Sequence, residues 1–233
     1  PISASSQLRL WSQDNFGDDL IGNIRGGGIF YWDESAGATQ RAVALSDLSG
    51  ASNAPTVALS IMVSDVDRHV ICFGSNIIGS TTANPLFVRW SDTESATDWT
   101  PTATNQAGGT QLSQGSTIIG ALQTRQEILI WTDVGITSMR FVGAPFIFSF
   151  IEVASGPSLI SPNAAVSANN RVYFMDRGGF YSYSGSAQRL PCTVLDYVFN
   201  DINLGQQFKC FAASIESNNE VIWFYPSSDS SEI

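Results

Sequence analysis

Hydrophobic residues along this chain come in short runs separated by turn-forming residues. An apolar run at 128–131 is followed by Thr-Asp-Val-Gly and then by a second run at 136–139. Four apolar residues between turn formers are typical of a strand that is buried on both faces. The second run alternates, with Ile136 and Ser138 on one side, which predicts a half-buried strand paired with the first in a hairpin.

This pattern repeats 44 residues further along, from 172 after 128. Residues 172–183 align with residues 128–139 without a gap, and Gly179 falls on Gly135. A repeat of about 40 to 50 residues built from short strands is the spacing of a β-propeller blade. We therefore predict an all-β fold, a β-propeller built of four-stranded antiparallel blades. The predicted blades span approximately 7–45, 59–100, 117–158, 163–204 and 209–233, of which the last is incomplete.

The strongest apolar runs also predict the hydrophobic core of successive blades. Residues at the centre of such runs face neighbouring sheets on both sides and should be buried. The predicted core residues are Ile130, Trp131, Phe174, Val221 and Trp223.

One stretch has a helical period instead. Apolar residues follow each other at steps of three and one between 195 and 202, and Thr193 stands where it can cap the first turn. We predict a single short helix near 193–202, packed on the sheets.

Two polar stretches, 46–58 and 101–116, are predicted to be long loops. The last residues, 228–233, follow directly after a strong strand, so we expect the chain to be part of a longer protein.

The composition agrees with an all-β protein and excludes some other classes. The chain has 233 residues, of which 43% are hydrophobic and 14% charged, whereas disordered segments are rich in charge and poor in apolar residues. No apolar run reaches the roughly 18 residues of a membrane-spanning helix. The three cysteines lack CxxC spacing, so neither a disulfide framework nor a zinc site is predicted, and Cys72 is expected to be a buried small hydrophobe.

The net charge of −10 argues against a nucleic-acid-binding protein. Such proteins hold phosphates with a surplus of Lys and Arg. An acidic chain is still suited to line a channel through which DNA slides without binding.

Three short motifs are better explained by structure than by chemistry. Residues 26–28 are three glycines before a strand, but no Lys-Ser/Thr follows, which favours close backbone approach over a nucleotide site. Asp65 and Asp67 are expected to form a hairpin turn rather than a calcium loop, because few acidic residues follow them. His69 has no second histidine or nearby cysteine as a metal partner and is expected to be an exposed structural residue.

Residues 91–100 are similar to the Asp-box turn of sialidase-type propellers, Ser-x-Asp-x-Gly-x-Thr-Trp. Here Ser91 is followed directly by Asp92, and the glycine is missing. Such a turn is structural, because its aspartate caps backbone amides and its tryptophan, here Trp99, packs in the core.

Several stretches together resemble tail nozzle and hub proteins of short-tailed bacteriophages. The match runs in order over nearly the whole chain, and no motif in it carries chemistry. It rests on residues 11–20 with 26–33, 89–92 with 98–101, 124–133, 161–165, 190–194 and 220–227.

The resemblance implies a structural virion protein that is located in the tail and assembled in the host cytoplasm. In that family, β-propeller subunits form a homohexameric ring below an adaptor ring, in contact with other tail proteins. The ring is a conduit for DNA retention and ejection, and genomic DNA passes through it without sequence-specific binding. The resemblance implies no enzyme activity, no catalytic, cofactor-binding or metal-binding residue, and no cofactor.

Two other functions remain as alternatives. A glycan-binding or glycan-hydrolysing, sialidase-like propeller would need an arginine cluster and a suitably placed carboxylate. The sequence shows scattered arginines and no Glu at an obvious strand end beside a Tyr. A WD40-type scaffold would carry Gly-His and Trp-Asp signatures, and only residues 31–33 come close. The scattered arginines are Arg25, Arg89, Arg125, Arg140 and Arg171.

Overall fold

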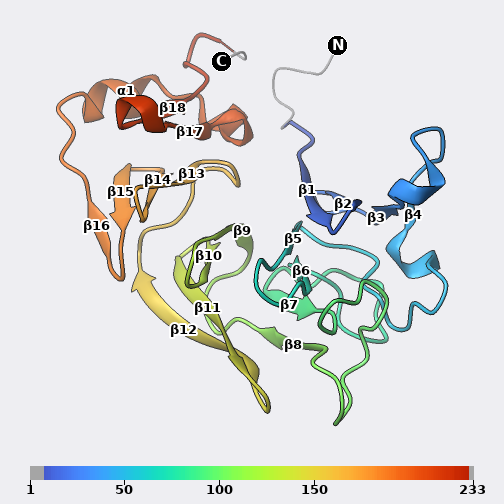
Figure 1. The fold of residues 1–233 in the computed structure, drawn as a ribbon. Coiled ribbons are helices and arrows are strands. Elements are labelled where there is room, and N and C mark those ends of the chain that lie inside the picture. Colours follow the sequence, from blue (N-terminus) through green and yellow to red (C-terminus); the bar gives the residue numbers. More distant parts are fainter. Residues whose placement is uncertain (1–7, 231–233) are drawn as a thin grey trace. The chain divides into compact units, whose positions relative to one another are not determined.

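The computed structural model describes residues 8–230 (Figure 1). Residue 7 of the first expected blade and residues 231–233 of the last lie outside this range. The chain divides into two compact units. One contains residues 9–118 and 143–147, and the other contains residues 119–142 and 148–230.

The unit that begins at residue 9 contains two four-stranded sheets. In each sheet the strands lie side by side in the order of the sequence, and the pairs are antiparallel. The first sheet consists of β1 (Trp11–Phe16), β2 (Asp19–Ile24), β3 (Ile29–Trp32) and β4 (Val43–Ala44). The second consists of β5 (Ser60–Val63), β6 (Val70–Phe73), β7 (Phe87–Trp90) and β8 (Gly108–Gln111).

The other unit is built on the same plan. Two more sequential four-stranded sheets are followed by a two-stranded sheet. The first consists of β9 (Ile118–Gln123), β10 (Ile128–Thr132), β11 (Gly135–Gly143) and β12 (Ile147–Ser155), and the second of β13 (Ala165–Ala168), β14 (Arg171–Asp176), β15 (Gly179–Tyr183) and β16 (Ala187–Arg189). The last sheet pairs β17 (Phe211–Ile215) with β18 (Glu220–Phe224).

The fold is therefore all-β and built of four-stranded antiparallel blades of the β-propeller type, as the sequence predicts. The register confirms the repeat. Ile128 pairs with Met139 in the β10–β11 hairpin. The residues 44 positions later, Val172 and Tyr183, pair in the same way in the β14–β15 hairpin. Equivalent positions of the repeat thus occupy equivalent positions in two sheets.

The expectation that residues 136–139, in the second strand of the repeat, are half-buried is wrong. Ser138 and Met139 are neighbours in β11 and are both buried. β11 is an inner strand of its sheet, between β10 and β12. Over residues 135–139 both of its faces are covered, so side chains on either face are buried there, whereas residues 140–142 are exposed.

The core prediction is confirmed for three of five residues. Ile130, Trp131 and Phe174 are 0% exposed. Val221 and Trp223 are only half-buried, which corrects the prediction. Their strand, β18, has β17 as its partner in a two-stranded sheet, so fewer neighbours cover it than an inner strand of a four-stranded blade.

The predicted helix is confirmed as α1 (Leu195–Asp201), with Val198 buried. Its N-cap is Val194, without a side-chain hydrogen bond, so the expected cap at Thr193 is wrong. Among residues 8–230 no helix has the length and apolar character to cross a membrane. Four 3-10 helices were not expected: η1 (Glu34–Ala36), η2 (Leu45–Asp47), η3 (Leu204–Lys209) and η4 (Glu216–Asn218).

The stretch 101–116 is not one long loop, because it contains β8. The second blade therefore extends to Gln111, beyond the expected end at 100. A Cβ on Gly108 would come within 2.6 Å of the Trp90 ring, and a Cβ on Gly109 within 2.9 Å of Phe87. Glycine is required for this close packing, and the absence of apolar side chains hides the strand from a hydrophobic pattern.

Candidate functional site

In the unit of residues 119–142 and 148–230, several side chains bind the carboxylate of Glu127, which stands directly before β10. A turn holds it there: the Thr124 amide donates to the Glu127 carbonyl at 2.8 Å, and the Thr124 hydroxyl bonds the same carbonyl at 2.7 Å. Hydroxyl–backbone bonds of this kind are characteristic of tight turns.

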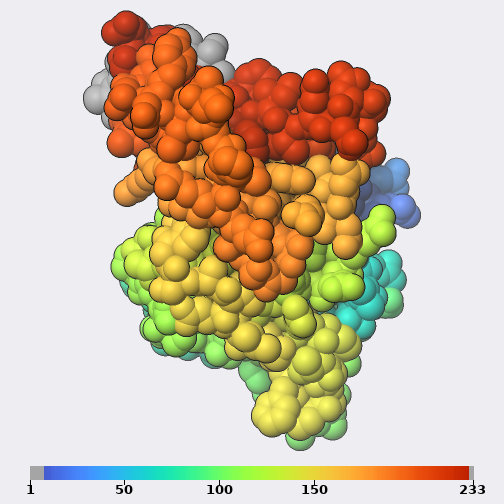
Figure 2. Space-filling view, turned by 90° about the vertical axis from the view of Figure 1, so that its left-hand side faces the viewer, coloured from blue at the N-terminus to red at the C-terminus, as the bar shows by residue number. Residues whose placement is uncertain are grey.

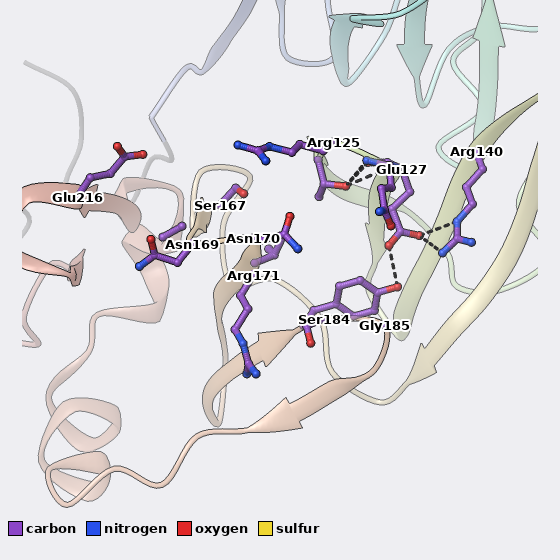
Figure 3. A pocket seen from close by; sticks show the side chains of 15 residues that line it. Arg125, Glu127, Arg140, Ser167, Asn169, Asn170, Arg171, Ser184, Gly185 and Glu216 are labelled. Carbon is purple, nitrogen blue, oxygen red and sulfur yellow. Dashed lines mark hydrogen bonds and ion pairs between the residues drawn. The ribbon is translucent and has the colours of Figure 1, made fainter.

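Side chains from two further strands converge on this carboxylate (Figure 3). Arg140 of β11 donates to Glu127 Oε2 from Nε at 3.1 Å and from Nη2 at 2.9 Å. The Ser138 hydroxyl donates to the same oxygen. The Tyr183 hydroxyl, at the end of β15, donates to Oε1 at 3.1 Å. Both carboxylate oxygens are therefore engaged.

These contacts fix the ionisation states of the cluster. Burial by itself raises the pKa of Glu127, but hydrogen bonds from Ser138, Arg140 and Tyr183 together lower it below its ordinary value. Burial, followed by the negative charge of Glu127, raises the pKa of Tyr183 to about 12. The carboxylate is thus stabilised as an anion and the phenol as a neutral group. Acid–base catalysis near neutrality needs the opposite shifts.

The structure corrects two expectations from the sequence. A Glu does stand at a strand end beside a Tyr, namely Glu127 beside Tyr183. The arginines are not all scattered, because Arg125, Arg140 and Arg171 line one pocket of about 580 Å³. Arg25 and Arg89 belong to the other unit.

The 44-residue repeat is the sequence feature that could have predicted this pocket. Residues 124–127 with Arg140 line it from one blade, and residues 168–171 with Ser184 line it from the next. These are equivalent positions, since 168 follows 124 by the same 44 residues that separate 172 from 128. The pocket therefore lies between equivalent edges of two consecutive sheets.

Replacing Glu127 with glutamine should lower the free energy of unfolding at pH 7 by about 2 kcal/mol, because charge-assisted hydrogen bonds are lost. The folded state holds Glu127 at a lowered pKa. Its stabilising contribution is therefore complete above the pKa of the unfolded chain and is lost as the pH falls through the folded pKa. Urea denaturation should show the difference from wild type shrinking below about pH 4. Glu216→Gln, at an exposed position, should show little difference at either pH, and a constant Glu127→Gln effect at all pH values would contradict this account.

The only histidine, His69, is not an exposed residue as expected. It is 0% exposed. Its Nδ1 donates to the Ser91 carbonyl at 2.7 Å, and its Nε2 lies 3.4 Å from Thr93 Oγ1. The ring joins the start of β6 to the 91–100 turn, which is a structural role.

The other motifs take the structural roles expected of them. Gly27 and Ala58 form an isolated antiparallel β-bridge, in which the Ala58 amide donates to the Gly27 carbonyl at 3.2 Å. Residues 65–67 form a turn between β5 and β6. In the 91–100 turn, Asp92 accepts from the Gln106 amide at 2.7 Å, and Trp99 is 1% exposed.

Metal-ligand and thiol chemistry have little support among residues 8–230. No group of three or more His, Cys, Asp and Glu side chains there is placed to hold a metal ion. Cys72 is buried as predicted, and burial raises the pKa of its thiol to about 12. Such a thiol is a weak nucleophile at neutral pH.

No family model and no curated protein matches the chain. The solved structure of Hsv2 from Kluyvelomyces marxianus is similar with a TM-score of 0.41 and 9% sequence identity, over 76% of this chain and 46% of the Hsv2 chain. This chain therefore spans less than half the length of that protein. A similarity of this size says nothing about what the chain binds.

Proposed function

We propose that this chain is a structural subunit of a bacteriophage tail, in the nozzle or hub of a short tail. The support from sequence is the resemblance that runs in order over nearly the whole chain. The successive four-stranded blades suit that role, since antiparallel blades protect most of their strand edges.

The observation that carries the proposal is an exposed apolar surface on the β11–β12 hairpin. These two strands have nine residues each, whereas other strands have two to six. The hairpin is visible in yellow in Figure 2. We call its exposed side chains the hairpin patch. It consists of Phe141, Val142 and Ile151, which are 40%, 53% and 55% exposed.

In this proposal the subunit contact lies on the hairpin patch rather than on the polar stretches 46–58 and 101–116. Several exposed apolar side chains on one hairpin are typical of a site of protein association. In a closed ring, each subunit presents this patch to a different surface of its neighbour.

The negative net charge of the chain supports a role as a conduit through which DNA moves freely. A chain with a net charge of −10 repels phosphates at short range. The ring would contact an adaptor ring and other tail proteins in the virion, and DNA would pass during retention and ejection.

We also propose that the chain is not an enzyme. Glu127 and Tyr183 are the pair that a sialidase-like mechanism would use, since a Tyr nucleophile replaces the usual carboxylate in that class. The pKa of Glu127 is lowered and that of Tyr183 is raised to about 12. Both shifts oppose proton transfer between the two groups.

Rings should appear when the purified protein is imaged by electron microscopy, with a sixfold mass by native mass spectrometry. The double change Val142→Ser and Ile151→Ser should abolish them, because apolar area buried in the contact contributes about 25 cal/mol per Å². The matched control is Val66→Ser, since Val66 is 81% exposed in a turn outside the hairpin patch. A monomeric wild-type protein, or rings that persist in the double variant with an unchanged fold, would rule out this assembly.

A further inference from the structure

The pocket between the two repeat edges is lined by three arginines and two carboxylates, which leaves a surplus of positive charge. Arg140 is paired with Glu127 at 2.9 Å. Arg125 and Arg171 are exposed, and within residues 8–230 neither forms an ion pair. Glu216 is a further carboxylate in the lining. On a chain of net charge −10, this is a local site of opposite sign.

The two arginines lie on different sides of the pocket. In Figure 3 the Arg125 side chain extends from the turn before β10, and Arg171 extends from the start of β14, with Asn170 between them. The guanidinium groups do not converge on one point. They are placed for two anionic groups on an extended ligand, each of which a guanidinium can bind with two parallel hydrogen bonds.

Neutral hydrogen-bonding groups also line the pocket. Ser167, Asn170 and Ser184 line the pocket with hydroxyl and amide groups. The pocket volume of about 580 Å³ lies within the usual range for ligand sites, about 300–1,000 Å³. A ligand rich in hydroxyls would find partners for them here.

A second cavity adjoins the first and has a different lining. Its volume is about 230 Å³, and it shares Ala168, Asn169 and Glu216 with the arginine-lined pocket. Tyr173, Val221 and Trp223 line it with aromatic and aliphatic groups. An amphipathic ligand could place a C–H face on these side chains while its polar groups stay in the first pocket.

We infer that the arginine-lined pocket binds an acidic oligosaccharide, with carboxylates on Arg125 and Arg171 and hydroxyls on Ser167, Asn170 and Ser184. A single inorganic anion would use one arginine and leave the rest of the site empty. A nucleic acid strand would add phosphates along an acidic surface, which is unfavourable. This binding function is separate from the proposed ring assembly, because none of these residues belongs to the hairpin patch.

The test is isothermal titration calorimetry of the protein with trigalacturonate, which carries a carboxylate on each unit, and with maltotriose as the neutral counterpart. Trigalacturonate should bind and be recovered intact. Arg125→Gln and Arg171→Gln should each weaken binding by about 10-fold or more, the effect of one lost charge-assisted hydrogen bond. The matched control is Arg177→Gln, an exposed arginine in the β14–β15 turn outside the pocket lining, which should leave binding unchanged.

Four results would overturn the assignment. These are no heat of binding up to about 10 mM trigalacturonate, equal binding of maltotriose, equal binding of inorganic phosphate, or tighter binding of oligothymidylate. If Arg177→Gln weakened binding as much as Arg125→Gln, the loss of affinity would be a general effect of net charge, which would also overturn the assignment. Ring formation by the same samples tests the structural proposal independently.

Discussion

Replacing Trp131 with alanine should lower the free energy of unfolding by about 3–5 kcal/mol. The Trp131 side chain, in β10, is 0% exposed, and its ring lies edge-on to Phe174 with centroids 5.5 Å apart. It belongs to the core cluster that joins β10 and β11 to β14 and β15. Alanine would leave a cavity that rigid strands on both sides cannot fill.

Urea denaturation followed by circular dichroism measures this loss in the unit that contains residues 119–142 and 148–230. The matched control is Tyr197→Ala in α1, where the aromatic ring is 72% exposed. That change should stay within about 0.5 kcal/mol of wild type. A loss of less than about 1 kcal/mol for Trp131→Ala would contradict the buried position and the repeat alignment that places it.

Replacing Arg89 with methionine should destabilise the other unit by about 3 kcal/mol. Arg89 is 1% exposed in β7. Its Nη1 donates to the Asn76 carbonyl at 3.4 Å, and its Nη2 donates to the carbonyls of Asn53 at 2.5 Å and Trp99 at 3.4 Å. Methionine fills similar space but leaves three carbonyls without these donors, and unsatisfied buried acceptors are costly.

Burying the charged guanidinium of Arg89 costs free energy, which these hydrogen bonds offset. Burial lowers the pKa of Arg89, and the guanidinium also lies 5.6 Å from the centre of the Trp99 ring. Arg89→Lys should be intermediate, because an ammonium has three donors and lacks the planar fork that reaches several carbonyls at once.

The control for Arg89 is Arg68→Met. Arg68 forms a 2.7 Å ion pair with Glu94, but the two side chains are 49% and 62% exposed. Solvent screens such a pair, so the change should cost at most about 1 kcal/mol. If Arg89→Met proved as stable as wild type, the three carbonyls would have to be satisfied by water, and Arg89 would not organise this part of the blade.

The candidate site was open to prediction only in part. Glu127 and Arg171 occupy the same position of the repeat, directly before or at the start of an inner strand, so the sequence does place them at equivalent sheet edges. Which partner each one meets depends on how the two sheets face each other. Tyr183 reaches Glu127 from 56 residues away, and no local pattern contains that contact.

The sequence alone determined the strands that carry many apolar residues, the hairpin repeat and α1. These features depend on contacts between near neighbours in the chain, on turn residues such as Gly135 and Gly179, and on the spacing of apolar side chains. β8 was missed because Gly108 and Gly109 bring no apolar side chain to the pattern. Only the tertiary structure decided that His69 and Arg89 are buried, because their hydrogen-bond acceptors lie on segments distant in sequence. It also decided that part of the β11–β12 hairpin stays exposed, since burial depends on which surface covers a strand and not on the strand itself.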